Sequence, residues 1–220
     1  MARDQSLLDW PSIFESIDTI KQELVDYFPY KIIDVEGAEA DDVIAVIASH
    51  FVQYSNVIVS SDKDFVQLHP LGIKQYSPKH KTWITHADPK LFLIEHIMKG
   101  DSTDGIPNVR SPDSFFVDQS SKKQMPITKL MINQAMEGVI SDAVHLRNFN
   151  RNQQLIDLSF VPSDISAQII EQYNAQTNNR PINKIYDYMI KYKLRNLMLD
   201  LSDFKEGTNE TTAISHTKAS

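Results

Sequence analysis

Three short acidic clusters constrain this chain the most, because each stands where a helix or a strand begins or ends. The first, residues 39–42, opens an apolar helical pattern; the second, 62–64, follows a β-branched run; the third, 101–104, follows another helical pattern. Carboxylates repel one another, so gathering them costs stability unless cations neutralise them. The clusters therefore predict a divalent metal site suited to phosphodiester chemistry.

The first hundred residues alternate between strand and helix patterns. Strands are expected at 30–35 and 57–59, and helices at 39–54 and 89–98. Further expected elements are a helix from the start signal at 9–11 to about 27, a short helix or turn at 62–68, and strands at 73–76 and 82–85 around a polar turn. This order predicts an α/β fold with a parallel sheet, whose strands present ligand sites at their carboxyl ends. Glu39, Asp62 and Asp64 would then share one edge of the sheet.

From about residue 100 helical periodicity replaces the strands. Candidate helices cover 127–136, 141–149, 152–158, 162–173 and 182–192, with Ser163 a possible cap. We therefore expect an α/β region at 1–98, a helical region at 99–204, and a disordered tail at 205–220, which has few large apolar residues.

Composition narrows the function classes. The chain has no cysteine, which excludes disulfides, thiolate metal sites and thiol catalysis. No signal core or membrane-length apolar run is present, so we expect no membrane partner. The net charge of -7 argues against tight non-specific nucleic-acid binding, although metal ions bound at the acidic clusters would cancel much of it.

Each acidic cluster also has a purely structural interpretation. Acids are favoured in a first helical turn, and Asp42 in particular could be a cap or an outer group. Ser61 or Asp62 could cap a short helix. Asp101 and Asp104, between Gly100 and Gly105, could form a helix end followed by an Asx-turn. The joint occurrence of all three clusters favours a shared metal site. The seven histidines show no paired metal-binding spacing, and we expect surface or partly buried positions for them.

At these residues the chain resembles a known family. Residues 39–42, 61–68 and 100–109 are similar to the acidic motifs of the 5′-nucleases, the flap endonucleases and 5′→3′ exonucleases, most of all their branch of phage ribonucleases H. The resemblance implies a PIN-like 5′-nuclease core followed by a helix-three-turn-helix DNA-binding region. It also implies a phosphodiester hydrolase that removes RNA primers and 5′ flaps during phage DNA replication, on DNA and RNA·DNA hybrids in the cytoplasm of the infected bacterial host.

The same resemblance implies two Mg²⁺ ions, with Mn²⁺ as a substitute. Glu39 and Asp41, with Asp42 nearby, would serve the first ion, and Asp62, Asp64, Asp101 and Asp104 would surround the second. Glu39, Asp41, Asp62 and Asp64 would form the catalytic group. Products would carry 5′-phosphates and 3′-hydroxyls. Six basic side chains would contact DNA phosphates: Lys63, Lys99, Arg110, Lys122, Lys123 and Lys129.

The chain departs from the family pattern before Glu39. Family members begin with an Asp-bearing strand, with a second Asp before the acidic helix, and neither is found here. We therefore expect an amino-terminally truncated core that needs a separately encoded amino-terminal half and is inactive alone. Single-stranded-DNA-binding protein and a sliding clamp are further expected partners. The alternative is a non-catalytic DNA-binding or replication-accessory fragment, and a third reading is an incomplete gene product that exposes apolar sheet surface.

Overall fold

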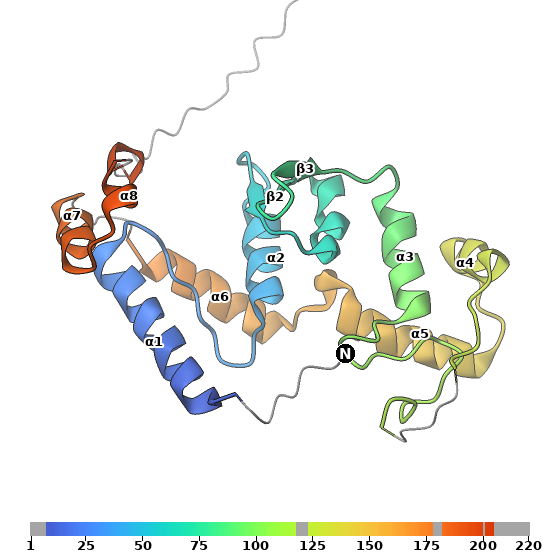
Figure 1. Cartoon of the computed structure of the whole chain (residues 1–220). Coiled ribbons are helices and arrows are strands. Elements are labelled where there is room, and N and C mark those ends of the chain that lie inside the picture. Colours follow the sequence, from blue (N-terminus) through green and yellow to red (C-terminus); the bar gives the residue numbers. More distant parts are fainter. Residues whose placement is uncertain (1–7, 118–122, 178–181, 200, 205–220) are drawn as a thin grey trace, which may run out of the picture. The chain divides into compact units, whose positions relative to one another are not determined.

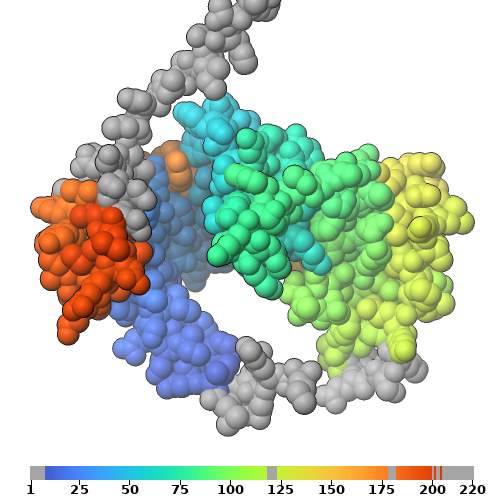
Figure 2. All heavy atoms as spheres, turned by 45° about the horizontal axis from the view of Figure 1, so that its top comes forward, coloured from blue at the N-terminus to red at the C-terminus, as the bar shows by residue number. Residues whose placement is uncertain are grey.

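The computed structural model describes residues 8–117, 123–177, 182–199 and 201–204, and Figure 1 shows the order of their elements. The chain divides into two compact units. One comprises residues 34–170, called the central unit here, and the other comprises both ends of the chain, 1–33 and 171–220, called the terminal unit. In Figure 2 the central unit continues from its cyan part through green α3 (Pro89–Lys99) to yellow.

The central unit holds one three-stranded sheet in the order β1-β2-β3 (Val57–Val59, Lys74–Ser77 and Thr82–Ile84). β1 and β2 are parallel, with Ile58 opposite Gln75. β2 and β3 are antiparallel, with Tyr76 opposite Trp83. The predicted parallel pairing is thus correct for β1 and β2 but wrong for β2 and β3, so the sheet is mixed. The turn at 78–81 is too short for the crossover that parallel strands need, so it closes a hairpin.

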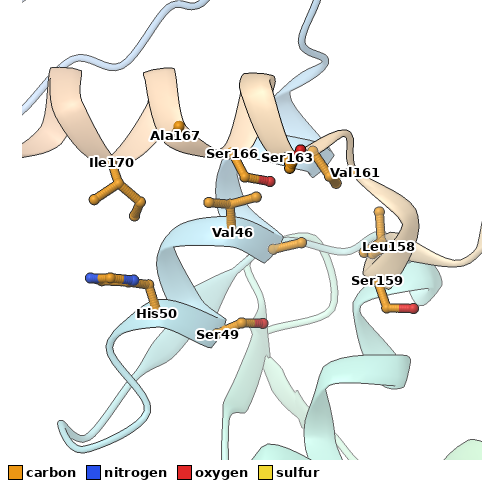
Figure 3. A pocket seen from close by; sticks show the side chains of 11 residues that line it. Val46, Ser49, His50, Leu158, Ser159, Val161, Ser163, Ser166, Ala167 and Ile170 are labelled. Carbon is orange, nitrogen blue, oxygen red and sulfur yellow. The ribbon is translucent and has the colours of Figure 1, made fainter.

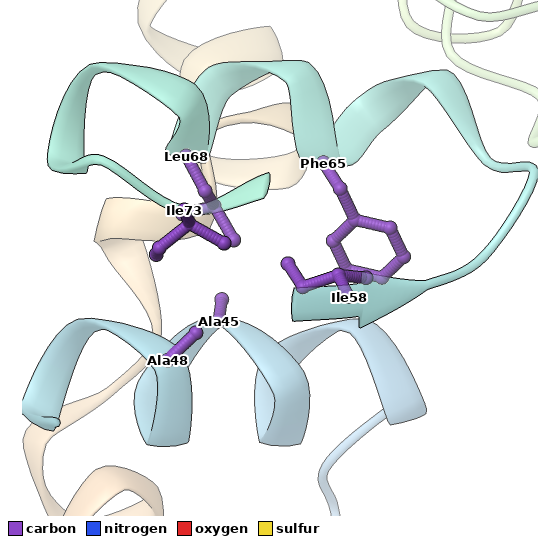
Figure 4. Packing of buried hydrophobic residues seen from close by; sticks show 6 residues of the cluster. All are labelled: Ala45, Ala48, Ile58, Phe65, Leu68 and Ile73. Atoms are coloured by element: carbon purple, nitrogen blue, oxygen red, sulfur yellow. The ribbon is translucent and has the colours of Figure 1, made fainter. Parts of the chain in front are cut away.

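The first core joins the sheet to two helices. α2 (Ala40–His50) and the 3₁₀ helix η2 (Lys63–Leu71) pack on β1. Figure 4 shows the side chains that meet there: Ala45, Ala48, Ile58, Phe65, Leu68 and Ile73. The small alanines let α2 approach the strand closely. The helix predicted at 39–54 is shorter in the structure and ends at His50.

The second core lies among α3, α4 (Lys129–Met136) and α5 (Ala143–Ile156). α5 is one continuous helix, which corrects the two helices expected at 141–149 and 152–158. Its middle, 149–152, contains neither proline nor glycine, so nothing breaks it. η3 (Leu158–Phe160) and α6 (Ser163–Ala175) follow.

The terminal unit is helical, with α1 (Trp10–Tyr27), α7 (Ile182–Lys191), α8 (Arg195–Met198) and η4 (Leu201–Phe204). Its core is centred on Phe28, Ile185 and Met189. The strand expected at 30–35 is not formed. Instead the backbone N–H of Ile32 donates to Gln176 Oε1 at 2.9 Å, and Ile32 O accepts from Gln176 Nε2 at 2.7 Å. A side-chain amide thus takes the place of a neighbouring strand.

Over the described ranges, no helix is both long enough and apolar enough to cross a membrane. The tail expected to be disordered, 205–220, lies outside the described residues. The division into regions 1–98 and 99–204 stays a prediction.

Candidate metal and nucleic-acid site

The second acidic cluster begins where β1 ends. Asp62 caps η2, because its Oδ1 accepts a hydrogen bond of 3.0 Å from the backbone N–H of Asp64. Gln75 of β2 is buried and donates from Nε2 to the carbonyl oxygens of Ser60, at 3.0 Å, and Asp62, at 2.5 Å. The turn that carries both aspartates is therefore fixed to the sheet. The capping interpretation is confirmed, and it leaves Asp62 Oδ2 and Asp64 Oδ2 for other partners.

Asp41 of the first acidic cluster lies close enough to Asp62 and Asp64 of the second to be repelled by them. Glu39 is the N-cap of α2, and its backbone N–H donates to Asp42 Oδ2 at 2.9 Å in a capping box. Asp42 is thus a cap. Burial raises the pKa of Asp41 to about 6, and repulsion by Asp62 and Asp64 adds to this. Asp41, Asp62 and Asp64 therefore concentrate negative charge at one place.

The raised pKa of Asp41 predicts a pH-dependent stability difference. Folded Asp41 keeps its proton up to about pH 6, whereas the unfolded group releases it near its ordinary pKa of 3.8. The folded state binds more protons in that window, so the stability contribution falls as pH rises from about 4 to 6. In EDTA, Asp41→Asn should therefore melt at a higher temperature than the unmodified chain at pH 7, and the difference should shrink towards pH 4. Asp18→Asn, at an exposed site, is the control. Equal melting temperatures at pH 7 would show that neither burial nor repulsion of the charged Asp41 costs stability.

The third cluster is a tight turn after α3. Gly100 has φ +67°, and a Cβ there would lie 2.3 Å from Ile106 O. The backbone N–H of Ile106 donates to Asp101 O at 2.7 Å, which closes the turn. Asp101 Oδ1 accepts from Thr103 N at 2.8 Å, the expected Asx-turn. Burial alone would raise the pKa of Asp101, but hydrogen bonds from Thr103 and His96 lower it to about 2.

His96 connects the second and third clusters, and the sequence analysis missed it. This buried side chain lies on the last turn of α3, with Nδ1 3.2 Å from Asp64 Oδ1 and Nε2 3.1 Å from Asp101 Oδ2. The contact between His96 Nδ1 and Asp64 Oδ1 does not have the geometry of a hydrogen bond, and neither atom has a hydrogen-bond partner in the described structure. The close Asp64 carboxylate raises the pKa of His96. The available signal was a histidine five residues before Asp101, at a helix end.

Some of the basic side chains predicted to contact DNA already have partners within the chain. Lys63 Nζ lies 3.9 Å from Asp101 Oδ2, so it borders the acidic site. Lys99 pairs with Glu95 at 2.5 Å, and Arg110 Nη1 donates to Pro126 O at 3.0 Å. Lys123 and Lys129 are exposed, as is Asp104 of the third cluster, whereas Lys122 lies outside the described residues.

The loop after the third cluster is anchored by α5. Asn148 is buried, and its Nδ2 donates to Val109 O at 2.9 Å and Ser111 O at 3.0 Å. Asn152 Nδ2 donates to Ile97 O at 2.8 Å and Pro107 O at 2.9 Å. Two α5 arginines, Arg147 and Arg151, also pair with Asp113. These bonds fix the chain that leaves Asp101 and Asp104 to the second core.

The acidic clusters do not form a closed metal cage. Within the described ranges, no group of three or more histidine, aspartate or glutamate side chains is arranged to hold an ion. The assignment of Glu39, Asp41, Asp42, Asp62, Asp64, Asp101 and Asp104 as ligands stays a prediction. A cavity of about 650 Å³ lies elsewhere in the central unit (Figure 3). It is lined by α2, η3 and α6 and contains no carboxylate, so it is not the catalytic site.

The chain is similar to known proteins over most of its length. Residues 11–93 match the family model of the 5′-3′ exonuclease N-terminal resolvase-like domain, and residues 87–204 match that of the T4 RNase H C-terminal part. The chain is 32% identical over 214 residues to ribonuclease H of Enterobacteria phage T4, which covers 92% of this chain and 70% of that protein. It is 37% identical over 82 residues to flap endonuclease Xni of Shewanella piezotolerans, covering 33% and 32% of the two chains.

Proposed function

Because this chain belongs to the family of phage T4 ribonuclease H and the 5′-3′ exonucleases, and is thus a nuclease, we propose that it is a divalent-metal-dependent 5′→3′ exonuclease and flap endonuclease with ribonuclease H activity. Its substrates would be RNA primers in RNA·DNA hybrids and 5′ flaps in phage DNA replication, in the cytoplasm of the bacterial host. The observation that carries the proposal is that Asp41 lies close enough to Asp62 and Asp64, which follow the carboxyl end of β1, to be repelled by both.

The residues at this edge suit Mg²⁺, with Mn²⁺ as a substitute. Mg²⁺ prefers carboxylate oxygens, and it commonly takes one or two from the protein with water and substrate phosphate completing its shell. Asp64 Oδ1 is buried without a hydrogen bond among the described residues, and Asp41 is held against like charges. Both observations indicate negative charge that a cation would neutralise. Glu39, Asp41, Asp62 and Asp64 would hold up to two ions, with Asp42 and Asp104 nearby.

The bound metal would lower the pKa of the attacking water and stabilise the leaving 3′-oxygen. The chain itself would orient the scissile phosphate. Lys63, exposed and 3.9 Å from Asp101, would contact a phosphate oxygen beside the acidic edge. Lys99, Arg110, Lys122, Lys123 and Lys129 would hold the duplex through its backbone, in a helix-three-turn-helix region that follows the third cluster. The products would carry 5′-phosphate and 3′-hydroxyl ends.

The test is cleavage of two labelled substrates, a 5′ flap and an RNA·DNA hybrid, by the purified chain with Mg²⁺, with Mn²⁺ and with EDTA. Metal-dependent release of 5′-phosphate products supports the proposal. A chain that cleaves neither substrate, alone or with an amino-terminal half supplied, contradicts it.

A second candidate function is a DNA-binding or replication-accessory module without catalysis. It is favoured by one observation, that no three acidic or histidine side chains of the described chain form a metal cage. This function predicts that Asp62→Ala/Asp64→Ala binds flap DNA as the unmodified chain does. Single-stranded-DNA-binding protein and a sliding clamp are proposed partners of either function.

An unfilled groove beside β1 supports the proposed amino-terminal partner. The outer edge of β1 has no neighbouring strand in the described structure, and Val57 and Val59 are 46% and 66% exposed. With α2 they line an apolar groove of about 260 Å³. No undescribed segment of this chain has a strand-length apolar run, and the match to phage T4 ribonuclease H covers only 70% of that protein. An extended segment of the amino-terminal half would pair with this edge.

A charged side chain in this groove is expected to prevent that pairing. The probe is the part of phage T4 ribonuclease H outside the match, added to this chain, with hydrogen exchange of the β1 amides as the measurement. Binding should slow their exchange at least about tenfold, and Val59→Lys should abolish the effect while remaining folded, because Val59 is exposed. Val144→Lys, at a 61% exposed valine of α5, is the matched control. Unchanged exchange in the unmodified chain would refute this docking site.

A further inference from the structure

The third acidic cluster touches the acidic edge through a histidine. His96 projects from the last turn of α3, and its ring lies between Asp64 of η2 and Asp101 of the following turn. All three side chains are largely buried, with 7%, 23% and 14% of their side-chain surface exposed. The backbone around them is fixed: Gly100 N donates to His96 O at 2.8 Å and ends the helix. One imidazole thus joins two segments that are distant in sequence.

The oxygens of Asp101 are already engaged. Oδ1 accepts from both the backbone N–H and the hydroxyl of Thr103, and Oδ2 contacts His96 Nε2 at 3.1 Å, with Lys63 Nζ 3.9 Å away. Asp64 differs, because its Oδ1 has only the His96 contact and no hydrogen bond in the described part of the chain. The order of contacts is therefore Asp101, His96, Asp64, and Asp64 is also close enough to Asp41 to repel it.

Such an arrangement is suited to orienting a ligand side chain. Residues that contact a metal-ligating side chain fix its orientation, and their loss typically weakens metal affinity by about 10- to 100-fold. The partners on the two sides of His96 come from different segments, so removal of the ring frees Asp64 to rotate. Packing alone does not explain the contact, because both ring nitrogens face carboxylate oxygens.

We propose that His96 is a positioning residue, and that Asp101 acts through it to orient Asp64 rather than by binding the metal itself. This inference rests on the proposed metal-dependent function. It reassigns Asp101 from the predicted ligand set to a support behind Asp64. It also gives the third cluster a definite role: its turn places the Asp101 carboxylate against His96 Nε2.

The test measures Mn²⁺ binding by the whole chain. Electron paramagnetic resonance gives the concentration of free Mn²⁺, and a thermal melt checks that every variant is folded. His96→Ala is expected to weaken Mn²⁺ affinity by about 10- to 100-fold. Asp101→Asn should have a similar effect, and the double variant should bind no more weakly than either single one. Additive losses would overturn the proposal, because they would mean that Asp101 binds the ion independently.

Two conservative variants separate positioning from packing. Asn carries its amide where His96 Nδ1 lies and so retains the contact to Asp64, whereas Gln carries it where Nε2 lies. Each variant therefore breaks one of the two contacts, His96→Asn the one to Asp101 and His96→Gln the one to Asp64, so each should weaken Mn²⁺ affinity by about 10- to 100-fold, as His96→Ala does. An Mn²⁺ affinity within threefold of the unmodified chain, in the Asn variant, the Gln variant or His96→Ala, would overturn the proposal.

Asp62→Ala/Asp64→Ala distinguishes a failure of this inference from a failure of the proposed function. Weaker Mn²⁺ binding by that variant with unchanged binding by His96→Ala would overturn only the role of His96. If the unmodified chain does not bind Mn²⁺, or if Asp62→Ala/Asp64→Ala binds it equally well, the metal site is overturned and this inference with it.

Discussion

The Asp62→Ala/Asp64→Ala variant is expected to cleave a 5′ flap and an RNA·DNA hybrid about 10³-fold more slowly than the unmodified chain, or not at all. Metal ions contribute several kcal/mol to such a transition state, and each 1.36 kcal/mol corresponds to a factor of about ten in rate. Both residues lie on the turn that Gln75 fixes at the end of β1. The measurement is the single-turnover rate at saturating Mg²⁺, with the amino-terminal half added to every sample.

Two controls make that result specific. Glu15→Ala/Asp18→Ala removes two exposed acids from α1 and should leave the rate unchanged, which excludes a simple effect of net charge. A far-ultraviolet spectrum and a thermal melt should show that the Asp62→Ala/Asp64→Ala variant is folded. If the folded variant cleaves within tenfold of the unmodified rate, the acidic edge is not the catalytic site and the accessory function is favoured.

Replacement of Asn152 is expected to have the largest effect on stability. Asn152 is completely buried, and its amide donates to Ile97 O and Pro107 O while its Oδ1 accepts from Arg151 Nε at 2.9 Å. Asn152→Ala removes the donors and leaves Ile97 O buried without this hydrogen bond. Each buried polar group left unsatisfied costs about 1–3 kcal/mol, and the small cavity adds to this. The free energy of unfolding should fall by about 2–4 kcal/mol.

Asn150 provides a matched control for this prediction. It lies on the same helix two residues earlier and is exposed, so Asn150→Ala removes the same atoms and should change the free energy of unfolding by less than about 0.5 kcal/mol. Urea unfolding followed by circular dichroism measures both variants. If Asn152→Ala costs no more than Asn150→Ala, the loop that follows Asp101 is not held by α5, and the anchoring described above is wrong.

Local signals explain the elements that the sequence predicted well. Asp9 accepts from Ser12 N and Pro11 follows, so α1 begins where the start signal indicated. Asp88 and Pro89 begin α3 in the same way, and Gly100 ends it with a positive φ. Caps, prolines and glycines act within a few residues of one another, and they can therefore be recognised without tertiary structure.

Pairing between distant residues explains the predictions that failed. The run at 30–35 has strand composition, but Gln176, more than a hundred residues later, takes its backbone hydrogen bonds. β3 joins the sheet as a hairpin because the turn at 78–81 is short, although the surrounding alternation favoured a parallel order. Strand propensity indicates a segment that fits a sheet, whereas the available partner determines whether and how it pairs.

The sequence by itself determined the three acidic clusters, their positions at element ends and the family to which the chain belongs. Those features depend on residue type and short spacing, which the sequence states directly. The tertiary structure decided how the clusters relate: Asp41 against Asp62 and Asp64, Asp42 as a cap, and His96 between Asp64 and Asp101. His96 could not be found from spacing, because its two carboxylates come from segments that only the packing of α3 against η2 brings together.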